Sequence, residues 1–362
     1  MNRVSHVVLV AAFVWPVETT ATPPTRNYYI YVCAESDDTV HKLRYGPGGL
    51  EEVKKIPVGS FPAETEGPHG ISVSPDKKHW FVSIAHGMPF GSIHKYAAET
   101  DEWLADVPVG MFPATMAVSP ATGLLFVVNF DLHGDMKPST ISVVETSTML
   151  EVARIDTGTM PHGARMNGKG TRLYSVNMMD DNLVEVDTLA FEVSRTLSLA
   201  PEGNHERHDA AHPSSAVKPT WSTVPTADGK LYVAGNGNNT IYEIDLLAWR
   251  VSRTFDAGPG MGPYNLDVTS DGKLLLATYK SGAHVGIWDL PAGKERARIK
   301  TTRSVPHGIA VSDDDRYAFV TLEGVGGEPG TVEVYDLAAN ERVAQADVGK
   351  QAGGITFWKG EP

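Results

Sequence analysis

A short motif returns along this chain at nearly regular intervals, and that repeat constrains the fold more than any other feature. It is clearest as Pro-His-Gly around His69, His162 and His307. The position that the histidine holds in this motif is called the slot here. In weaker copies of the motif the slot holds Ala114, Thr220, Tyr264 and Gly353. Differences between successive slot numbers give intervals of 45, 48, 58, 44, 43 and 46 residues. Such a period indicates seven small units that share one continuous core.

Each unit reads as four short strands, called A to D here. In the first complete unit an alternating stretch, 71–74, precedes an apolar run, 79–84. A second alternating stretch, 92–96, and a last strand, 103–109, follow. The chain has 35 glycines and 24 prolines, which suits short strands joined by tight turns. Four antiparallel strands in about 45 residues are typical of a β-propeller blade.

The two ends of the chain complement each other. The stretches 28–34, 39–45 and 52–58 look like strands B, C and D with no A before them. The stretch 354–358 looks like an A strand with nothing after it. Joined together they make one blade and leave no open sheet edge. The sequence therefore predicts an all-β, seven-bladed β-propeller, a single domain over 22–362, with its last blade closed by both termini.

Residues 1–21 read as a signal peptide. Arg3 supplies the positive charge, and the apolar run 7–14 is too short to span a membrane. Small residues at 19–21 offer a cleavage site. We expect a periplasmic or secreted protein with no membrane span after signal cleavage; a retained anchor is the alternative.

Charge and motifs exclude several classes of partner. The net charge of −13 argues against a nucleic-acid partner, because phosphates need a basic surface. No phosphate-binding glycine loop, nucleophile elbow or His-Glu-x-x-His motif occurs, so no nucleotide cofactor is expected. The one cysteine, Cys33, stands in an apolar stretch and is expected to be buried.

Blade topology predicts which residues meet at one mouth of the central channel. Strand A lines the channel and begins where its antiparallel neighbour B finishes, so both ends share one mouth. Starts of A supply His69, His162, Trp221, Tyr264 and His307. Ends of B supply Glu35, His86, Asn129, His133, Asn177, Lys280 and Glu323. The long insertion before Thr220 adds His205, His208 and His212.

Three imidazoles from three blades predict a transition-metal site. Neutral imidazole is the commonest metal ligand, and an all-nitrogen site suits copper or zinc. Three imidazoles with an open position are typical of a catalytic metal. We take His69, His162 and His307 as core ligands, with His86 and His133 as additional ligands or as partners that orient the ligands. The residues predicted to bind a further ligand are Tyr264, Trp221, Asn129, Asn177, Glu323, Lys280 and His208.

The same pattern has a structural interpretation. Proline fixes the entry to strand A, glycine allows a tight bend, and the histidine between them would only hydrogen-bond to neighbouring loops. The protein would then be a non-catalytic binding module whose mouth takes a small molecule or a partner protein. Whether it is an enzyme stays open. Histidine fills only three of the seven slots, however, and a pure fold requirement would fill them more uniformly.

Two resemblances add to this interpretation. The pattern Pro-x-Gly-Ile-x-Val-Ser-Pro-Asp, with Leu-Tyr-Val-Ala and Ile-x-x-Ile-Asp further on, resembles the YVTN-type repeats of exported bacterial β-propellers. That family implies the fold and serves binding, scaffolding and enzymatic roles. More loosely, the chain is similar to the propeller domain of nitrous oxide reductase, where histidines at the channel mouth hold copper. By position in the blade, the matching residues would be His69, His86, His133, His162 and His307. The cupredoxin domain that delivers electrons there is lacking, so that reaction is not implied.

Overall fold

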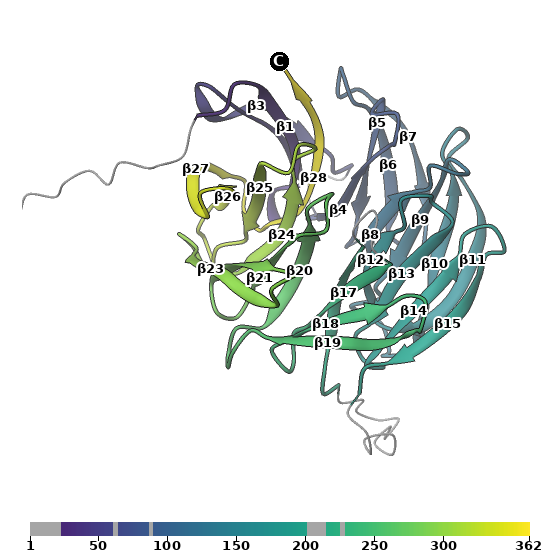
Figure 1. Cartoon of the computed structure of the whole chain (residues 1–362). Helices are drawn as coiled ribbons and strands as arrows, with labels where there is room; N and C mark the ends of the chain where they lie inside the picture. Colours follow the sequence, from purple (N-terminus) through teal and green to yellow (C-terminus); the bar gives the residue numbers. More distant parts are fainter. Residues whose placement is uncertain (1–22, 61–63, 87–89, 201–214, 225–228) are drawn as a thin grey trace, which may run out of the picture.

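Seven four-stranded antiparallel sheets surround one central axis (Figure 1). The structure is a computed structural model, and it describes residues 23–60, 64–86, 90–200, 215–224 and 229–362. The predicted seven-bladed β-propeller is confirmed. The signal peptide predicted at 1–21 lies outside the described residues. Within the described ranges no helix has the length and apolar character needed to cross a membrane.

The blades are numbered along the chain, each from its inner to its outer strand. Blade 1 consists of β4 (Pro68–Val73), β5 (His79–Ile84), β6 (Ser92–Ala97) and β7 (Trp103–Pro108). Blade 2 consists of β8 (Pro113–Val118), β9 (Leu124–Asn129), β10 (Pro138–Glu145) and β11 (Leu150–Thr159). Blade 3 consists of β12 (Pro161–Met166), β13 (Arg172–Asn177), β14 (Asn182–Asp187) and β15 (Glu192–Ser198).

Blades 4 to 6 continue in the same order. Blade 4 consists of β16 (Pro219–Thr223), β17 (Lys230–Gly235), β18 (Thr240–Asp245) and β19 (Arg250–Asp256). Blade 5 consists of β20 (Pro263–Val268), β21 (Leu274–Tyr279), β22 (His284–Asp289) and β23 (Lys294–Lys300). Blade 6 consists of β24 (Pro306–Val311), β25 (Tyr317–Leu322), β26 (Gly330–Asp336) and β27 (Glu341–Val348).

The closing blade combines both termini, as predicted. Its inner strand is β28 (Ala352–Glu361), followed by β1 (Asn27–Ala34), β2 (Thr39–Gly46) and β3 (Gly49–Pro57). In Figure 1 the yellow β28 lies beside the purple β1. One short 3-10 helix, η1 (Glu35–Asp37), joins β1 to β2. Because its strands come from both ends of the chain, this blade fixes the ring as one closed unit.

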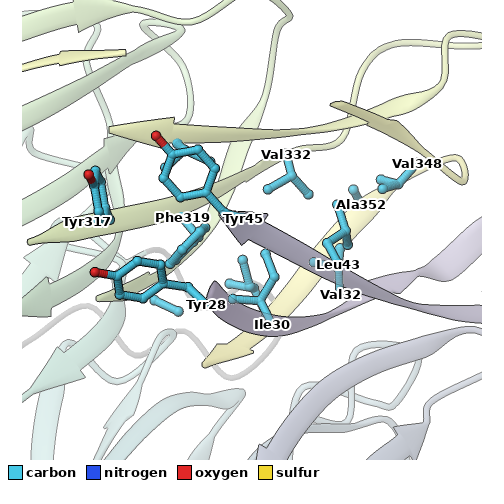
Figure 2. Packing of buried hydrophobic residues seen from close by; sticks show 13 residues of the cluster. Tyr28, Ile30, Val32, Leu43, Tyr45, Tyr317, Phe319, Val332, Val348 and Ala352 are labelled. Carbon is cyan, nitrogen blue, oxygen red and sulfur yellow. The ribbon is translucent and has the colours of Figure 1, made fainter. Parts of the chain in front are cut away.

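Aromatic packing joins the closing blade to blade 6. Figure 2 shows Tyr28 and Tyr45 from β1 and β2 beside Tyr317 and Phe319 from β25. The ring centroids of Tyr28 and Tyr317 lie 5.2 Å apart, and those of Tyr45 and Tyr317 lie 5.0 Å apart. These side chains are buried, and edge-to-face pairs of this kind add to the burial of apolar area.

The seven inner strands approach one another closely around the channel. The residue after the slot is glycine in four blades, where a Cβ would strike the next inner strand. A Cβ on Gly70 would lie 1.9 Å from the Ala114 carbonyl oxygen, and one on Gly354 would lie 2.1 Å from that of His69. A hydrogen bond also joins neighbouring blades. Oγ1 of Thr278, in blade 5, donates to the carbonyl oxygen of His307, in blade 6, at 2.9 Å. The narrow channel therefore requires these glycines.

Candidate functional site

In every blade, a residue with a left-handed backbone conformation precedes the inner strand and directs the slot residue toward the mouth. Two positions before the slot, the backbone φ is +66° at Gly67, +52° at Met160 and +62° at Val305. The other four blades do the same at Phe112, Lys218, Gly262 and Gln351. This conformation is unfavourable for residues other than glycine, and most of all for a β-branched valine. The blade ends therefore keep a sharp turn at an energetic cost, and the turn starts each inner strand at the same level.

The structure brings the three predicted core histidines together with Tyr264. The ring centroid of His69 lies 6.2 Å from that of His162 and 5.8 Å from that of His307. The Tyr264 ring lies 5.6 Å from His162 and 4.8 Å from His307. All three imidazoles line one cavity of about 30 Å³ in the channel. Slots that are distant in sequence thus form one cluster.

A buried carboxylate joins two of the mouth histidines. Nδ1 of His69 donates to Oε2 of Glu35 at 2.8 Å, and Nε2 of His86 donates to Oε1 at 2.7 Å. Burial alone would raise the pKa of Glu35, but the charges and hydrogen bonds of His69 and then His86 hold it below its usual range. The Glu35 hydrogen bond raises the pKa of His86. Glu35 is therefore an ionised anchor for two imidazoles.

The other two core histidines are neutral. Nδ1 of His162 donates to the Thr220 carbonyl oxygen at 2.8 Å, and its Nε2 accepts from the Tyr264 hydroxyl at 3.2 Å. Burial, with the nearby charge of His69, lowers the pKa of His162 to about 3. Burial and the charge of Lys280 lower the pKa of His307 well below its usual value. Nδ1 of His307 has no hydrogen-bond partner among the described residues.

A charged pair borders this cluster. Nζ of Lys280, after β21, lies 2.8 Å from Oε1 of Glu323, after β25. The same ammonium lies 4.1 Å from the centroid of the Tyr264 ring. Nε2 of His307 lies 3.9 Å from Oε1 of Glu323. Three of the residues predicted to bind a ligand, Tyr264, Lys280 and Glu323, therefore share one wall of the mouth.

His133 lies apart from the core cluster. Its ring centroid is 5.6 Å from that of His86 and 5.5 Å from that of Phe112. The buried Phe112 ring also contacts His69 and His86, each at 5.1 Å between centroids. Phe112 thus provides an apolar wall beside these imidazoles. The prediction that His133 is a metal ligand stays a prediction.

Two predicted amides already have hydrogen-bond partners within the protein. Oδ1 of Asn129 accepts from the Gly110 N–H at 3.1 Å, and Nδ2 donates to Oγ of Ser142 at 2.9 Å. Asn177 is held in a similar way, between the Gly158 N–H of blade 2 and Asn182 of its own blade. This geometry gives both a structural role, and their predicted contact with a ligand stays a prediction. His208, with the rest of its loop, lies outside the described residues.

Trp221 stands one residue past the slot and lines the cavity below the histidines. It is 6% exposed, and its indole Nε1 has no hydrogen-bond partner among the described residues. Oδ1 of Asn265, also on the cavity wall, is buried without a partner as well. Buried polar atoms in this state point to water or another small ligand in the cavity.

The histidine cluster does not form a metal-binding arrangement as it stands. In the part of the chain that the structure describes, no three His, Cys, Asp or Glu side chains are arranged to hold a metal ion. Imidazoles bound to one tetrahedral ion at about 2.0–2.1 Å would have ring centroids roughly 5 Å apart. The observed centroid distances, 5.8 and 6.2 Å, exceed that value by about 1 Å.

The sequence reasoning missed a second level of the channel. The residues three positions after the slots form one ring around the channel. They are Ser72, Ala117, Arg165, Thr223, Asp267, Ala310 and Thr356. Six of these seven line a cavity of about 240 Å³, Thr223 being the exception. The sequence does contain a signal for this level, because the residues three positions after the slots include one cation, Arg165, and one anion, Asp267, among neutral residues.

Comparison with known proteins supports the fold. No family model and no curated protein matches the chain. Hydrazine synthase of Kuenenia stuttgartiensis is similar in structure, with 20% identity, 82% of this chain and 93% of that chain covered, and a TM-score of 0.66. A Lactobacillus plantarum protein has 13% identity, coverage of 92% and 99%, and a TM-score of 0.73. A candidate 6-phosphogluconolactonase of Bacteroides fragilis has 12% identity, coverage of 91% and 98%, and a TM-score of 0.70. At these identities the likeness establishes a β-propeller and no activity.

Proposed function

We propose that the histidine mouth binds a transition-metal ion, copper or zinc, with His69, His162 and His307 as core ligands. One observation carries the proposal. Nδ1 of His69 donates to a carboxylate, and Nδ1 of His162 donates to a backbone carbonyl. Metal-binding histidines characteristically donate their second ring N–H in this way, which fixes the tautomer and leaves Nε2 as the ligand atom. At His162 the ion would replace the Tyr264 hydroxyl, from which Nε2 accepts a hydrogen bond.

The charge and size of the mouth support the same proposal. Low pKa values keep His162 and His307 neutral, which is the form that binds metals. The carboxylates of Glu35 and Glu323 would balance part of the charge of the ion. A cavity of about 30 Å³ suits an ion with one water, whereas organic ligands occupy pockets of roughly 300–1,000 Å³.

The bound ion would act on a small molecule as a Lewis acid or redox centre, through a coordination position that the three histidines leave open. The looser resemblance to the nitrous oxide reductase propeller favours copper. We further propose that the protein is exported, since the resembling YVTN-type propellers are exported and residues 1–21 read as a signal. His86 would hold Glu35 in place, because it binds the second oxygen of that carboxylate.

A non-catalytic binding module is the second candidate. The observation in its favour is that His69, Glu35 and His86 already satisfy one another without an ion. In this role the mouth would present fixed polar groups to a small molecule or partner protein.

Metal titration of tag-free protein tests the first candidate. We expect one Cu²⁺ or Zn²⁺ per chain by calorimetry, and added ion at 100 times Kd should stabilise the fold by about 2.7 kcal/mol. The double variant His69→Ala, His307→Ala should lose the stoichiometric ion, whereas His79→Ala, in β5, should keep it. Wild-type protein that binds neither ion and gains no stability would contradict the metal proposal. Partner binding that survives the double substitution would then count against the binding module as well.

A further inference from the structure

The lower level of the channel carries one cation and one anion on an otherwise neutral wall. The cavity there, about 240 Å³, is lined by the third residues after the slots: Ser72, Ala117, Arg165, Asp267, Ala310 and Thr356. Apolar side chains fill the spaces between them, among them Ile309 and Phe357. Arg165 comes from blade 3 and Asp267 from blade 5. Arg165 also lines the smaller cavity that the three histidines share, whereas Asp267 lines only the lower one.

The Arg165 guanidinium is oriented but not neutralised. Its Cζ lies 4.3 Å from the centroid of the Trp221 ring, so the indole supports the planar group. Nη1 donates to the Ala164 carbonyl oxygen at 3.0 Å, and within the described ranges this is its one hydrogen bond to the protein. A guanidinium has five N–H donors, so most of those on Arg165 are free for a ligand.

Asp267 is fixed in the same cavity wall. Its Oδ1 accepts from the Val268 N–H and its Oδ2 accepts from the Val311 N–H, both at 2.9 Å. These bonds hold the carboxylate plane and leave each oxygen a further lone pair. No ion pair within 4.0 Å joins Asp267 to Arg165. Two opposite charges thus line one cavity and interact across it without contact.

We propose that the lower channel binds a small zwitterion, an α-amino acid with a short apolar side chain. The ligand carboxylate would take the free N–H groups of Arg165, which suit a bidentate carboxylate. Its ammonium would donate to Asp267, and its side chain would lie on the apolar wall. A simple anion would be repelled by Asp267 and a simple cation by Arg165, so the pair selects a ligand with both charges. The cavity volume limits it to a small molecule.

Valine and two analogues that each keep only one of its charges, called its halves here, test this proposal directly. Isovalerate carries the same side chain with only the carboxylate, and isobutylamine carries it with only the ammonium. We expect valine to bind at least tenfold more tightly than either half in calorimetry. The ¹⁵N-indole signal of Trp221, which stacks on Arg165, should shift saturably with valine.

Variants separate the site from a general effect. Arg165→Met and Asp267→Asn should each weaken valine binding at least tenfold, whereas the exposed Arg296→Met should not change it. If either channel variant fails to fold, the wild-type comparison of valine with its halves still decides. No saturable response to valine up to about 10 mM in the wild type would overturn the proposal. Equal affinity for valine and one of its halves would overturn it too.

Discussion

Glu35 and Asp267 are both carboxylates in the channel wall, yet their environments shift their pKa values in opposite directions. At the mouth, imidazoles in direct contact outweigh burial and lower the pKa of Glu35. In the lower channel, burial dominates and raises the pKa of Asp267, because the Arg165 charge acts only from a distance. Asp267 accepts two backbone hydrogen bonds and still has a raised pKa. A charged partner within hydrogen-bond reach, and not the number of hydrogen bonds, therefore decides the state of a buried carboxylate here.

The two levels belong to the same seven strands, three residues apart. At the mouth, the protein itself pairs Glu35 with His69 and His86, and His162 with Tyr264. Below, the two charges come from blades 3 and 5, with blade 4 between them. The proposed ion would insert among these neutral and paired groups. The lower level is suited to a molecule that brings its own two charges.

Gly70 lies between these two levels, and its substitution should have the largest effect. In Gly70→Ala, the Cβ would lie 1.9 Å from the Ala114 carbonyl oxygen and 2.9 Å from its carbon. Both atoms are backbone, so blades 1 and 2 would have to separate. We expect a loss of roughly 3 kcal/mol in the free energy of unfolding, measured by urea denaturation.

The matched control is Gly327→Ala, because a Cβ on Gly327 meets no atom within 4 Å. Its unfolding free energy should stay within about 0.5 kcal/mol of the wild type. Equal stability of the two variants would mean that the inner strands can move apart freely. The separation of the channel into two fixed levels would then be wrong.

Glu35→Gln should have the next largest effect, of about 1–3 kcal/mol at its maximum, because it removes a buried charged acceptor from His69 and His86. The lowered pKa of Glu35 means that its contribution is present above the unfolded value of about 4.3 and is lost as the pH falls. The raised pKa of His86 means that its contribution is present below about 6.5 and is lost as the pH rises. The difference between variant and wild type should therefore be greatest near pH 5–6.

Urea denaturation at several pH values checks this window, with the exposed Glu192→Gln as the control. The control should run parallel to the wild type at every pH. A Glu35→Gln curve that also runs parallel to the wild type would show that the carboxylate does not hold these imidazoles in solution.

The repeat made the fold predictable, because each blade carries the same local signals and the ends complete one another. The convergence of His69, His162 and His307 followed from topology alone. The directions of the side chains did not follow from topology. Asn129, for example, donates a hydrogen bond to Ser142 in its own blade, which no spacing in the sequence reveals. The bridge through Glu35 depends on two imidazoles from blade 1 and one carboxylate from the closing blade. The geometry of this bridge depends on how blade 1 and the closing blade are placed relative to each other, which the repeat does not specify.

The smallest expected effect is a shift in one titration. In ¹³C NMR, the Asp267 carboxyl should titrate above the usual aspartate value of about 3.9, and Glu35 below the usual glutamate value of about 4.3. Arg165→Met should raise the pKa of Asp267 further, because the distant guanidinium favours the ionised carboxylate. The pKa of Glu35 should not change, since its shift comes from the two imidazoles it binds. An unchanged pKa of Asp267 in the variant would mean that the two charges do not interact across the lower channel, and a zwitterion would then have no electrostatic reason to bridge them.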